Sequence, residues 1–312
     1  MATVIEVRDL HKEYGQTVAV DNVSFTVEAG EIFGILGPNG AGKTTTVECV
    51  AGLRVPGAGS ISVLGLDPRR DRGQLRQVLG VQLQESQLPD RLRVGEALEL
   101  YSSFYRDPAP WPELLDRLGL AGKENTRFGK LSGGQRQRLS IALALVGNPR
   151  IAVLDELTTG LDPQARRDTW ALISGIRDRG VTVVLVTHFM EEAERLCDRV
   201  AVIDAGRVIA TGSPADLAAR AGEDQVIRFR PSAEVDEAVL LALPEVTGLV
   251  WLGDQLEVTG RGDVLGAVIS LLARRGIIAR QLRVEQTSLE DAFVALTAQH
   301  GNGREQSAPS RR

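Results

Sequence analysis

Residues 37–44 read Gly37-Pro38-Asn39-Gly40-Ala41-Gly42-Lys43-Thr44, and this stretch decides the fold. It has the spacing of a P-loop: a glycine, four residues, a second glycine, a lysine, then threonine or serine. The glycines let successive backbone N–H groups turn toward phosphate oxygens, and the start of a helix adds positive dipole there. We therefore expect the stretch, together with Thr45, to bind the phosphates of a nucleotide. Lys43 is expected to neutralise the β and γ phosphates, and Thr44 to offer its hydroxyl to Mg²⁺.

The elements on either side of the loop favour this interpretation over a plain glycine-rich turn. Residues 31–36 form a nearly continuous apolar run, which is typical of a strand buried on both faces of a parallel sheet. Residues 43–51 have the pattern of a helix. Strands and helices then alternate, with a mostly helical block from about 74 to 129. The predicted strands are 4–7, 23–27, 151–154, 181–187, 200–203 and 207–211, and the predicted helices are 132–146, 163–179, 190–197 and 214–221. This order predicts an α/β fold.

Two carboxylates, Asp155 and Glu156, follow the apolar run at 151–154. One carboxylate at a strand end is common, but two of them beside a P-loop match a Walker B pattern with a catalytic base. We expect Asp155 to hold Mg²⁺ through its water shell and Glu156 to orient and deprotonate the attacking water. Gly37, Asp155 and His188 each come at the carboxyl end of a predicted buried strand, where open α/β sheets place their ligand crevice.

A third motif, Leu131-Ser132-Gly133-Gly134-Gln135, opens the predicted helix at 132–146. Glycine is about 1 kcal/mol less favourable than alanine inside a helix, so two adjacent glycines there need a reason. They leave a backbone bare enough for a phosphate to approach. With its flanks, the pentapeptide resembles the signature of ATP-binding cassette (ABC) ATPases. The resemblance implies a RecA-like P-loop NTPase core with an antiparallel β part and a helical subdomain at about 74–145.

The resemblance also implies roles for positions outside the three motifs. Tyr14 resembles the aromatic residue that stacks on adenine, and His188 resembles the switch histidine on the γ-phosphate. Gln84 looks like the Q-loop residue that senses Mg²⁺ and the attacking water, although Gln82 lies two positions away. Asp162 falls in the segment that resembles the D-loop. The chain departs from the family at Leu157, where a proline usually follows the catalytic glutamate, and this puts the D-loop geometry in doubt.

Composition and charge exclude several classes of protein. The chain has 312 residues, of which 43% are hydrophobic and 25% charged, and no apolar run approaches the roughly 18 residues of a spanning helix. No secretory signal is visible at the start. The net charge is −5 and is spread along the chain, so no basic patch for nucleic acid is expected. Cys49 and Cys197 are expected to be buried free thiols.

A boundary is predicted near 221–224, which gives an ABC ATPase domain at 1–222. Residues 223–298 follow the order β-α-β-β-α-β of a ferredoxin-like extension, closed by a helix at 288–297. Its segment 286–293, QTSLEDAF, resembles the closing helix of the daunorubicin-resistance type of exporter ATPase. Residues 299–312 lack apolar content and are predicted to be a disordered tail.

The resemblance implies a function that needs partners. In this family the signature of one subunit completes the ATP site of another, and this chain has one P-loop and one signature, so a homodimer is expected. ATP is expected to close the dimer and hydrolysis to reopen it. Because no spanning segment is present, we expect a separate integral-membrane permease to use this motion. The chain would then lie at the cytoplasmic face of the cell membrane and energise efflux of a drug, antibiotic or lipid-like amphiphile.

Two alternatives stay open at this stage. The first is a soluble cassette ATPase of translation or DNA metabolism; the short spacing between Lys43 and Leu131 leaves no room for a coiled-coil or zinc insertion, which argues against the DNA class. The second concerns Tyr101, Phe104 and Tyr105, which have helical spacing. They are interpreted either as core packing or as part of a groove that receives a cytoplasmic helix of the permease.

Overall fold

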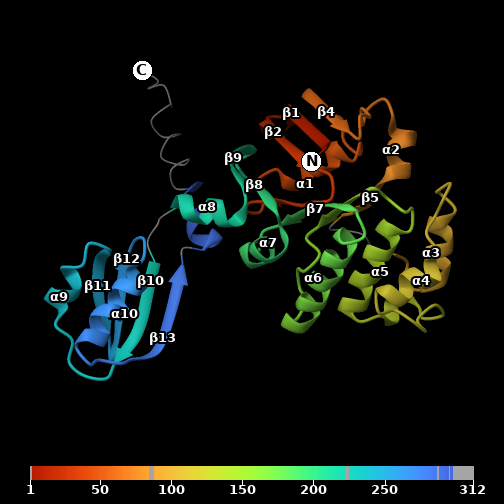
Figure 1. The fold of residues 1–312 in the computed structure, drawn as a ribbon. Coiled ribbons are helices and arrows are strands. Elements are labelled where there is room, and N and C mark those ends of the chain that lie inside the picture. Colours follow the sequence, from red (N-terminus) through yellow and green to blue (C-terminus); the bar gives the residue numbers. More distant parts are fainter. Residues whose placement is uncertain (1, 84–87, 222–224, 287, 295, 298–312) are drawn as a thin grey trace, which may run out of the picture. The chain divides into compact units, whose positions relative to one another are not determined.

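The computed structural model describes residues 2–83, 88–221, 225–286, 288–294 and 296–297. The chain forms two compact units, the first ending at Pro214 and the second beginning at Ala215 (Figure 1). The division between the units falls at the start of the helix α8 (Pro214–Ala221), so nearly all of α8 belongs to the second unit. From the sequence, this helix is predicted to lie in the first domain. None of the helices in the described ranges is long and apolar enough to cross a membrane.

A six-stranded sheet forms the centre of the first unit, in the order β5-β6-β7-β3-β8-β9. Its strands are β3 (Ile32–Leu36), β5 (Leu79–Gln82), β6 (Ile151–Asp155), β7 (Thr182–Thr187), β8 (Arg199–Asp204) and β9 (Arg207–Gly212). All neighbours run parallel except β8 and β9. Every residue of β3, β6 and β7 is buried, because helices or other strands cover both faces. The continuous apolar runs in the sequence predicted these three strands correctly.

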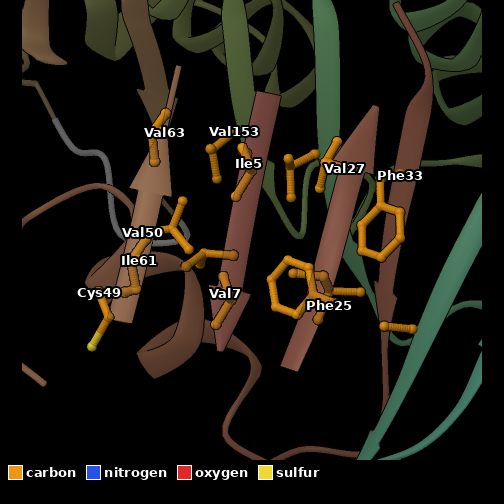
Figure 2. Close-up of a cluster of buried hydrophobic side chains, with 14 of the residues drawn as sticks. Ile5, Val7, Phe25, Val27, Phe33, Cys49, Val50, Ile61, Val63 and Val153 are labelled. Carbon is orange, nitrogen blue, oxygen red and sulfur yellow. The ribbon is translucent and has the colours of Figure 1, made fainter. Parts of the chain in front are cut away.

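An antiparallel sheet in the order β2-β1-β4 completes the β part of this unit. It consists of β1 (Thr3–Tyr14), β2 (Thr17–Glu28) and β4 (Ala58–Val63). Figure 2 shows side chains from this sheet gathered with others from β3, β6 and the helix α1 (Lys43–Val50) in one buried cluster. Within it the rings of Phe25 and Phe33 stack with centroids 5.4 Å apart. This shared core fixes the P-loop, which lies between β3 and α1, against both sheets.

The helices of the first unit are α2 (Arg72–Val78), α3 (Val94–Ser102), α4 (Trp111–Arg117), the short 3₁₀ helix η1 (Phe128–Lys130), α5 (Gly133–Leu145), α6 (Pro163–Arg177) and α7 (Met190–Leu196). The prediction of a mostly helical block at 74–129 missed β5, which follows α2 and joins the central sheet. A Cβ atom on Gly80 would lie 2.0 Å from the carbonyl oxygen of Ala144, so this strand needs a glycine, which weakens the strand signal.

The second unit has a four-stranded antiparallel sheet in the order β11-β12-β10-β13. Its elements are β10 (Gln225–Pro231), α9 (Glu237–Leu241), β11 (Val246–Leu252), β12 (Gln255–Gly260), α10 (Val264–Arg274) and β13 (Ala279–Gln286). This is the predicted β-α-β-β-α-β order, and the unit has its own apolar core around Phe229, Leu256 and Val268. Residues 289–294 are helical, and the predicted tail, 299–312, lies outside the described residues.

Candidate functional site

The P-loop connects the carboxyl end of β3 to the amino end of α1, and two of its glycines are required by close backbone contacts. A Cβ atom on Gly37 would lie 2.1 Å from the carbonyl oxygen of Ile203, and one on Gly42 would lie 2.2 Å from that of Ala19. Gly42, the residue before α1, also has a φ of 96°, which favours glycine. The loop is therefore held between β8 and β2 in a shape that only these residues allow.

Lys43 points back into this loop. Its Nζ donates hydrogen bonds to the carbonyl oxygens of Gly37 at 2.9 Å and Pro38 at 3.0 Å. Only 5% of its side chain is exposed, and burial lowers the pKa of Lys43, while the charges of Glu156 and Asp155 oppose this shift. The loop thus holds the ammonium group of Lys43 at the place where the sequence predicts the β and γ phosphates.

Asp155, the last residue of β6, is fully buried beside Thr44. The Thr44 hydroxyl donates a hydrogen bond of 3.2 Å to Oδ2 of Asp155, whereas Oδ1 is buried without a hydrogen-bond partner among the described residues. Burial raises the pKa of Asp155 to about 6, and the Thr44 hydrogen bond acts in the opposite direction. A buried carboxylate with an unused oxygen next to a hydroxyl is a donor set that suits Mg²⁺, which binds few protein oxygens and keeps water and phosphate ligands.

Glu156 follows directly and makes contacts on both sides. Its Oε1 lies 3.2 Å from Nδ1 of His188 and 4.0 Å from Nζ of Lys43, and 8% of its side chain is exposed. Its φ of 49° is in the left-handed region, which a non-glycine residue adopts at a cost and which is frequent at functional sites. His188 follows β7 and is 29% exposed, with its ring centroid 4.1 Å from that of Phe189.

The predicted Q-loop residue Gln84 lies outside the described residues. Gln82, the alternative in the sequence, is 5% exposed, and its Oε1 accepts a hydrogen bond of 3.2 Å from the backbone N–H of Asp155. Gln82 therefore fixes the end of β6 that carries the two carboxylates. Sequence reasoning missed this role, because nothing in the spacing shows that β5 lies beside β6.

The signature motif begins α5, and Ser132 and Gln135 form a capping box. The backbone N–H of Gln135 donates to the Ser132 hydroxyl at 3.3 Å, and the N–H of Ser132 donates to the Gln135 side chain at 3.0 Å. A Cβ atom on Gly133 would meet nothing within 4 Å, and one on Gly134 would make only an ordinary contact with Ala165 at 3.7 Å. Leu131 is buried. The fold of the described chain thus has no need for either glycine.

Asp162 and Tyr14 lie in different surroundings. Asp162 caps α6, because its Oδ1 accepts hydrogen bonds from the N–H groups of Gln164 at 3.0 Å and Ala165 at 2.9 Å. The ring of Tyr14 is 42% exposed, with Nζ of Lys12 5.2 Å from its centroid. Leu157, the departure from the family pattern, is fully buried.

Five predicted residues form one connected cluster at the carboxyl ends of β3, β6 and β7. Direct contacts join Thr44 to Asp155, Lys43 to Glu156, and Glu156 to His188. The signature begins α5, Asp162 caps α6 and Tyr14 ends β1, so these residues lie on other elements of the described chain. In the described part of the chain, no group of three or more His, Cys, Asp or Glu side chains could hold a metal ion by itself.

Together, the P-loop, the Walker B carboxylates and the histidine at adjacent strand ends define an ATP-binding cassette. Residues 20–159 match the family model described as ABC transporter. The chain is 39% identical over 306 residues to "Nod factor export ATP-binding protein I" of Rhizobium etli, covering 95% of this chain and 93% of that protein. The chain belongs to the ABC transporter family, as an ATPase coupled to transport.

Other relatives and solved structures agree with this membership. A daunorubicin resistance ATP-binding protein of Streptomyces coeruleorubidus is 37% identical over 305 residues, covering 95% of this chain and 96% of that one. An ATP-binding subunit of an ABC transporter superposes with a TM-score of 0.64 at 29% identity, over 70% of this chain and 93% of that one. A dimeric cassette bound to ADP and Pi gives a TM-score of 0.61 at 28% identity, over 67% and 98% of the two chains.

Proposed function

We propose that this chain is the ATP-hydrolysing subunit of an exporter that moves an amphiphile, such as a drug, an antibiotic or a lipid-like molecule, through a separate membrane permease. The direction of transport and the class of cargo are proposed from the names of two relatives: one is an export ATP-binding protein and another a daunorubicin resistance protein. Both match over nearly the whole chain, including the second unit. The cluster around Glu156 carries the chemistry.

Glu156 is proposed as the general base. An ionised carboxylate only accepts hydrogen bonds, so Nδ1 of His188 at 3.2 Å must carry the proton in this contact. The Nε2 of a neutral His188 is then an acceptor that can orient a water or a phosphate group. Lys43 lies 4.0 Å from the same oxygen and is proposed to neutralise phosphate charge.

Thr44 and Asp155 are proposed to hold Mg²⁺, with Gln84 as a further ligand. The unused buried oxygen of Asp155 and the adjacent Thr44 hydroxyl fit this ion. When bound, Mg²⁺ would neutralise charge on the β and γ phosphates and orient them. Gln82 positions Asp155 through its backbone N–H, so the carboxylate is already placed before the ion arrives.

A homodimer is proposed because no packing contact in the described part of one chain requires the signature glycines. Their backbone N–H groups lie at the start of α5, where a helix favours an anion, and the space beside Gly133 is open. We propose that Leu131, Ser132, Gly133, Gly134 and Gln135 complete the ATP site of a second copy, with Tyr14 of each copy stacked on its own adenine and Asp162 at the dimer contact. The dimeric relative supports this arrangement.

A groove of about 630 Å³ next to α2 and β5 is proposed to receive the permease. Its lining includes Leu53, Leu75 and Phe104, and Phe104 is 62% exposed. Tyr105 also lines the groove but is half-buried, and its ring packs where a Cβ atom on Gly147 would lie 2.3 Å away. The aromatic cluster thus divides: Tyr105 packs, whereas Phe104 faces outward. Docking there would hold the chain at the cytoplasmic face of the membrane.

We also propose the domain division of the sequence analysis: a cassette at 1–222, with a helical subdomain at about 74–145, and an extension at 223–298. The separate apolar core of the second unit supports an extension that folds around itself. No nucleic-acid partner is proposed.

Hydrolysis by Glu156 is tested by the variant Glu156→Gln. We expect it to lose steady-state ATP hydrolysis while it accumulates as an ATP-bound dimer, measured by phosphate release and by size-exclusion chromatography with ATP. Glu191→Gln, on the exposed face of α7, is the matched control and should behave like the wild type. Turnover by Glu156→Gln at the wild-type rate would remove Glu156 from the role of base.

Docking of the permease is tested by Phe104→Asp, with Leu241→Asp as a control at a similarly exposed position, 51%, in the second unit. Phe104→Asp should reduce the amount of integral-membrane protein that co-purifies with the wild-type chain from membranes, without changing the ATPase rate of the isolated subunit. Stable association of the wild type with ribosomes or DNA, and none with membranes, would contradict the exporter function.

A further inference from the structure

Glu192 is a buried carboxyl group with no role in the chemistry described above. It lies on α7 and is 0% exposed. Nε1 of Trp170, on α6, donates a hydrogen bond of 3.0 Å to its Oε1, and its Oε2 is buried without a hydrogen-bond partner among the described residues. An apolar side chain of similar volume would avoid the cost of burying this group. Its presence therefore needs a reason other than packing.

The groups around Glu192 come from the segments that carry two predicted site residues. Burial raises the pKa of Glu192, and the nearby polar groups of Thr187, Trp170 and Thr158 and the charge of Arg166 oppose this shift. Thr187 ends β7 directly before His188, and Thr158 lies between Glu156 and Asp162. Both threonines are buried.

The hydroxyl of Thr187 has a direct connection to the switch histidine. Its oxygen accepts a hydrogen bond of 3.0 Å from the backbone N–H of Phe189, so it fixes the turn that carries His188. A hydroxyl has one proton to donate, and a carboxylate oxygen such as that of Glu192 can only accept it. Glu192 lies near this hydroxyl, on the helix α7 that begins two residues after His188, and is therefore placed to hold the Thr187 side chain in the rotamer that supports this turn.

The segment leading to Asp162 also lies near Glu192. The Thr158 hydroxyl is buried without a partner within the described ranges, and its backbone carbonyl accepts from the N–H of Leu161 at 3.2 Å. Trp170 lies on α6, the helix that Asp162 caps. A second bridge joins the same parts, because the Arg166 guanidinium lies 4.7 Å from the ring centroid of Phe189.

We propose that Glu192 is a positioning residue that fixes the switch histidine and the Asp162 segment relative to each other, through Thr187 and the start of α7 on one side and Trp170 on the other. It thereby makes the placement of His188 on Glu156 depend on the placement of the segment that ends at Asp162. This inference rests on the roles proposed above for His188 and Asp162.

The test compares four purified proteins: the wild type, Glu192→Leu, Glu192→Gln and the exposed control Glu191→Leu. Glu192→Leu keeps the volume but removes the acceptor, and we expect kcat to fall about tenfold or more, with KM for MgATP within about twofold. Its thermal midpoint without nucleotide should change little, because removal of the buried carboxyl group offsets the loss of the acceptor for the Trp170 N–H. Glu192→Gln keeps a hydrogen-bonding side chain and should restore most of kcat, and Glu191→Leu should leave all three quantities unchanged.

A double-mutant cycle shows whether Glu192 acts through Thr187. Thr187→Val removes the hydroxyl at nearly constant shape, and its effect on kcat should not add to that of Glu192→Leu. Full additivity, an unchanged kcat in Glu192→Leu, or a lowered thermal midpoint that Glu192→Gln does not restore would each overturn the inference. If instead His188→Ala and Asp162→Ala leave kcat unchanged, the proposed roles of those two residues fail, whatever Glu192 does.

Discussion

Replacing Asp155 by Asn should make the nucleotide-free protein more stable and unable to hydrolyse ATP. The substitution keeps the size of the side chain and an oxygen that can accept from the Thr44 hydroxyl. It removes a charge from a fully buried position. Stability and function conflict here, because the buried charge is needed only when a cation is bound.

The magnitude follows from the pKa of Asp155, which burial raises from the ordinary 3.8 to about 6. Between these values the folded state binds the proton more tightly than the unfolded chain does, so the wild type loses stability as the pH rises through this range. At about 1.4 kcal/mol per pH unit, the full loss above pH 6 is about 3 kcal/mol. At about pH 5 the loss in the free energy of unfolding is roughly half of this value.

The assay is urea unfolding with EDTA at about pH 7.5 and pH 5, followed by tryptophan fluorescence. A Trp251→Phe background confines the signal to the first unit, where Trp170 is 3% exposed. Asp155→Asn should gain about 3 kcal/mol at the higher pH and about half of that at the lower pH. A variant that is no more stable than the wild type, or whose gain is the same at both pH values, would refute the reasoning.

Three further outcomes are expected. Ser132→Arg should abolish ATP-dependent dimerisation while nucleotide binding by the single chain persists, as measured by light scattering and by a fluorescent ATP analogue; unchanged dimerisation would contradict the proposed role of the signature. Gly133→Ala should stabilise the nucleotide-free protein by up to about 1 kcal/mol in urea and yet lower the ATPase rate, and a wild-type rate would show that a Cβ atom is tolerated there. Gln82→Leu should destabilise the first unit by about 1–3 kcal/mol, because the Asp155 N–H loses its acceptor, and an unchanged urea midpoint would exclude this.

The sequence was sufficient to predict the parts of the site that follow long apolar runs. The strands before Gly37, Asp155 and His188 are buried on both faces, so their composition alone identifies them. Because parallel strands bring their carboxyl ends to one edge, the prediction that these residues meet did not require the strand order. The Glu156–His188 and Thr44–Asp155 contacts bear this out.

The parts that the sequence did not predict depend on neighbours far away in the chain. β4 was missed, and β5 was taken as part of a helical block, because its four residues include a glycine that exists for the close approach of Ala144. The role of Gln82 depends on β5 pairing with β6, a fact of strand order that no local pattern contains. Similarly, the partners of Glu192 are brought together only by the packing of α6 and α7.

The open space beside the signature glycines has a consequence for directed evolution. Nothing in the described chain resists a methyl group at Gly133, so a library screened only for heat resistance or soluble yield would enrich alanine there. Under the role proposed for the signature, such variants would be stable but would hydrolyse ATP poorly. Screens of this subunit should therefore select on turnover in the assembled dimer, and frequent loss of these glycines in a screen without that requirement would itself indicate that the surface serves another molecule.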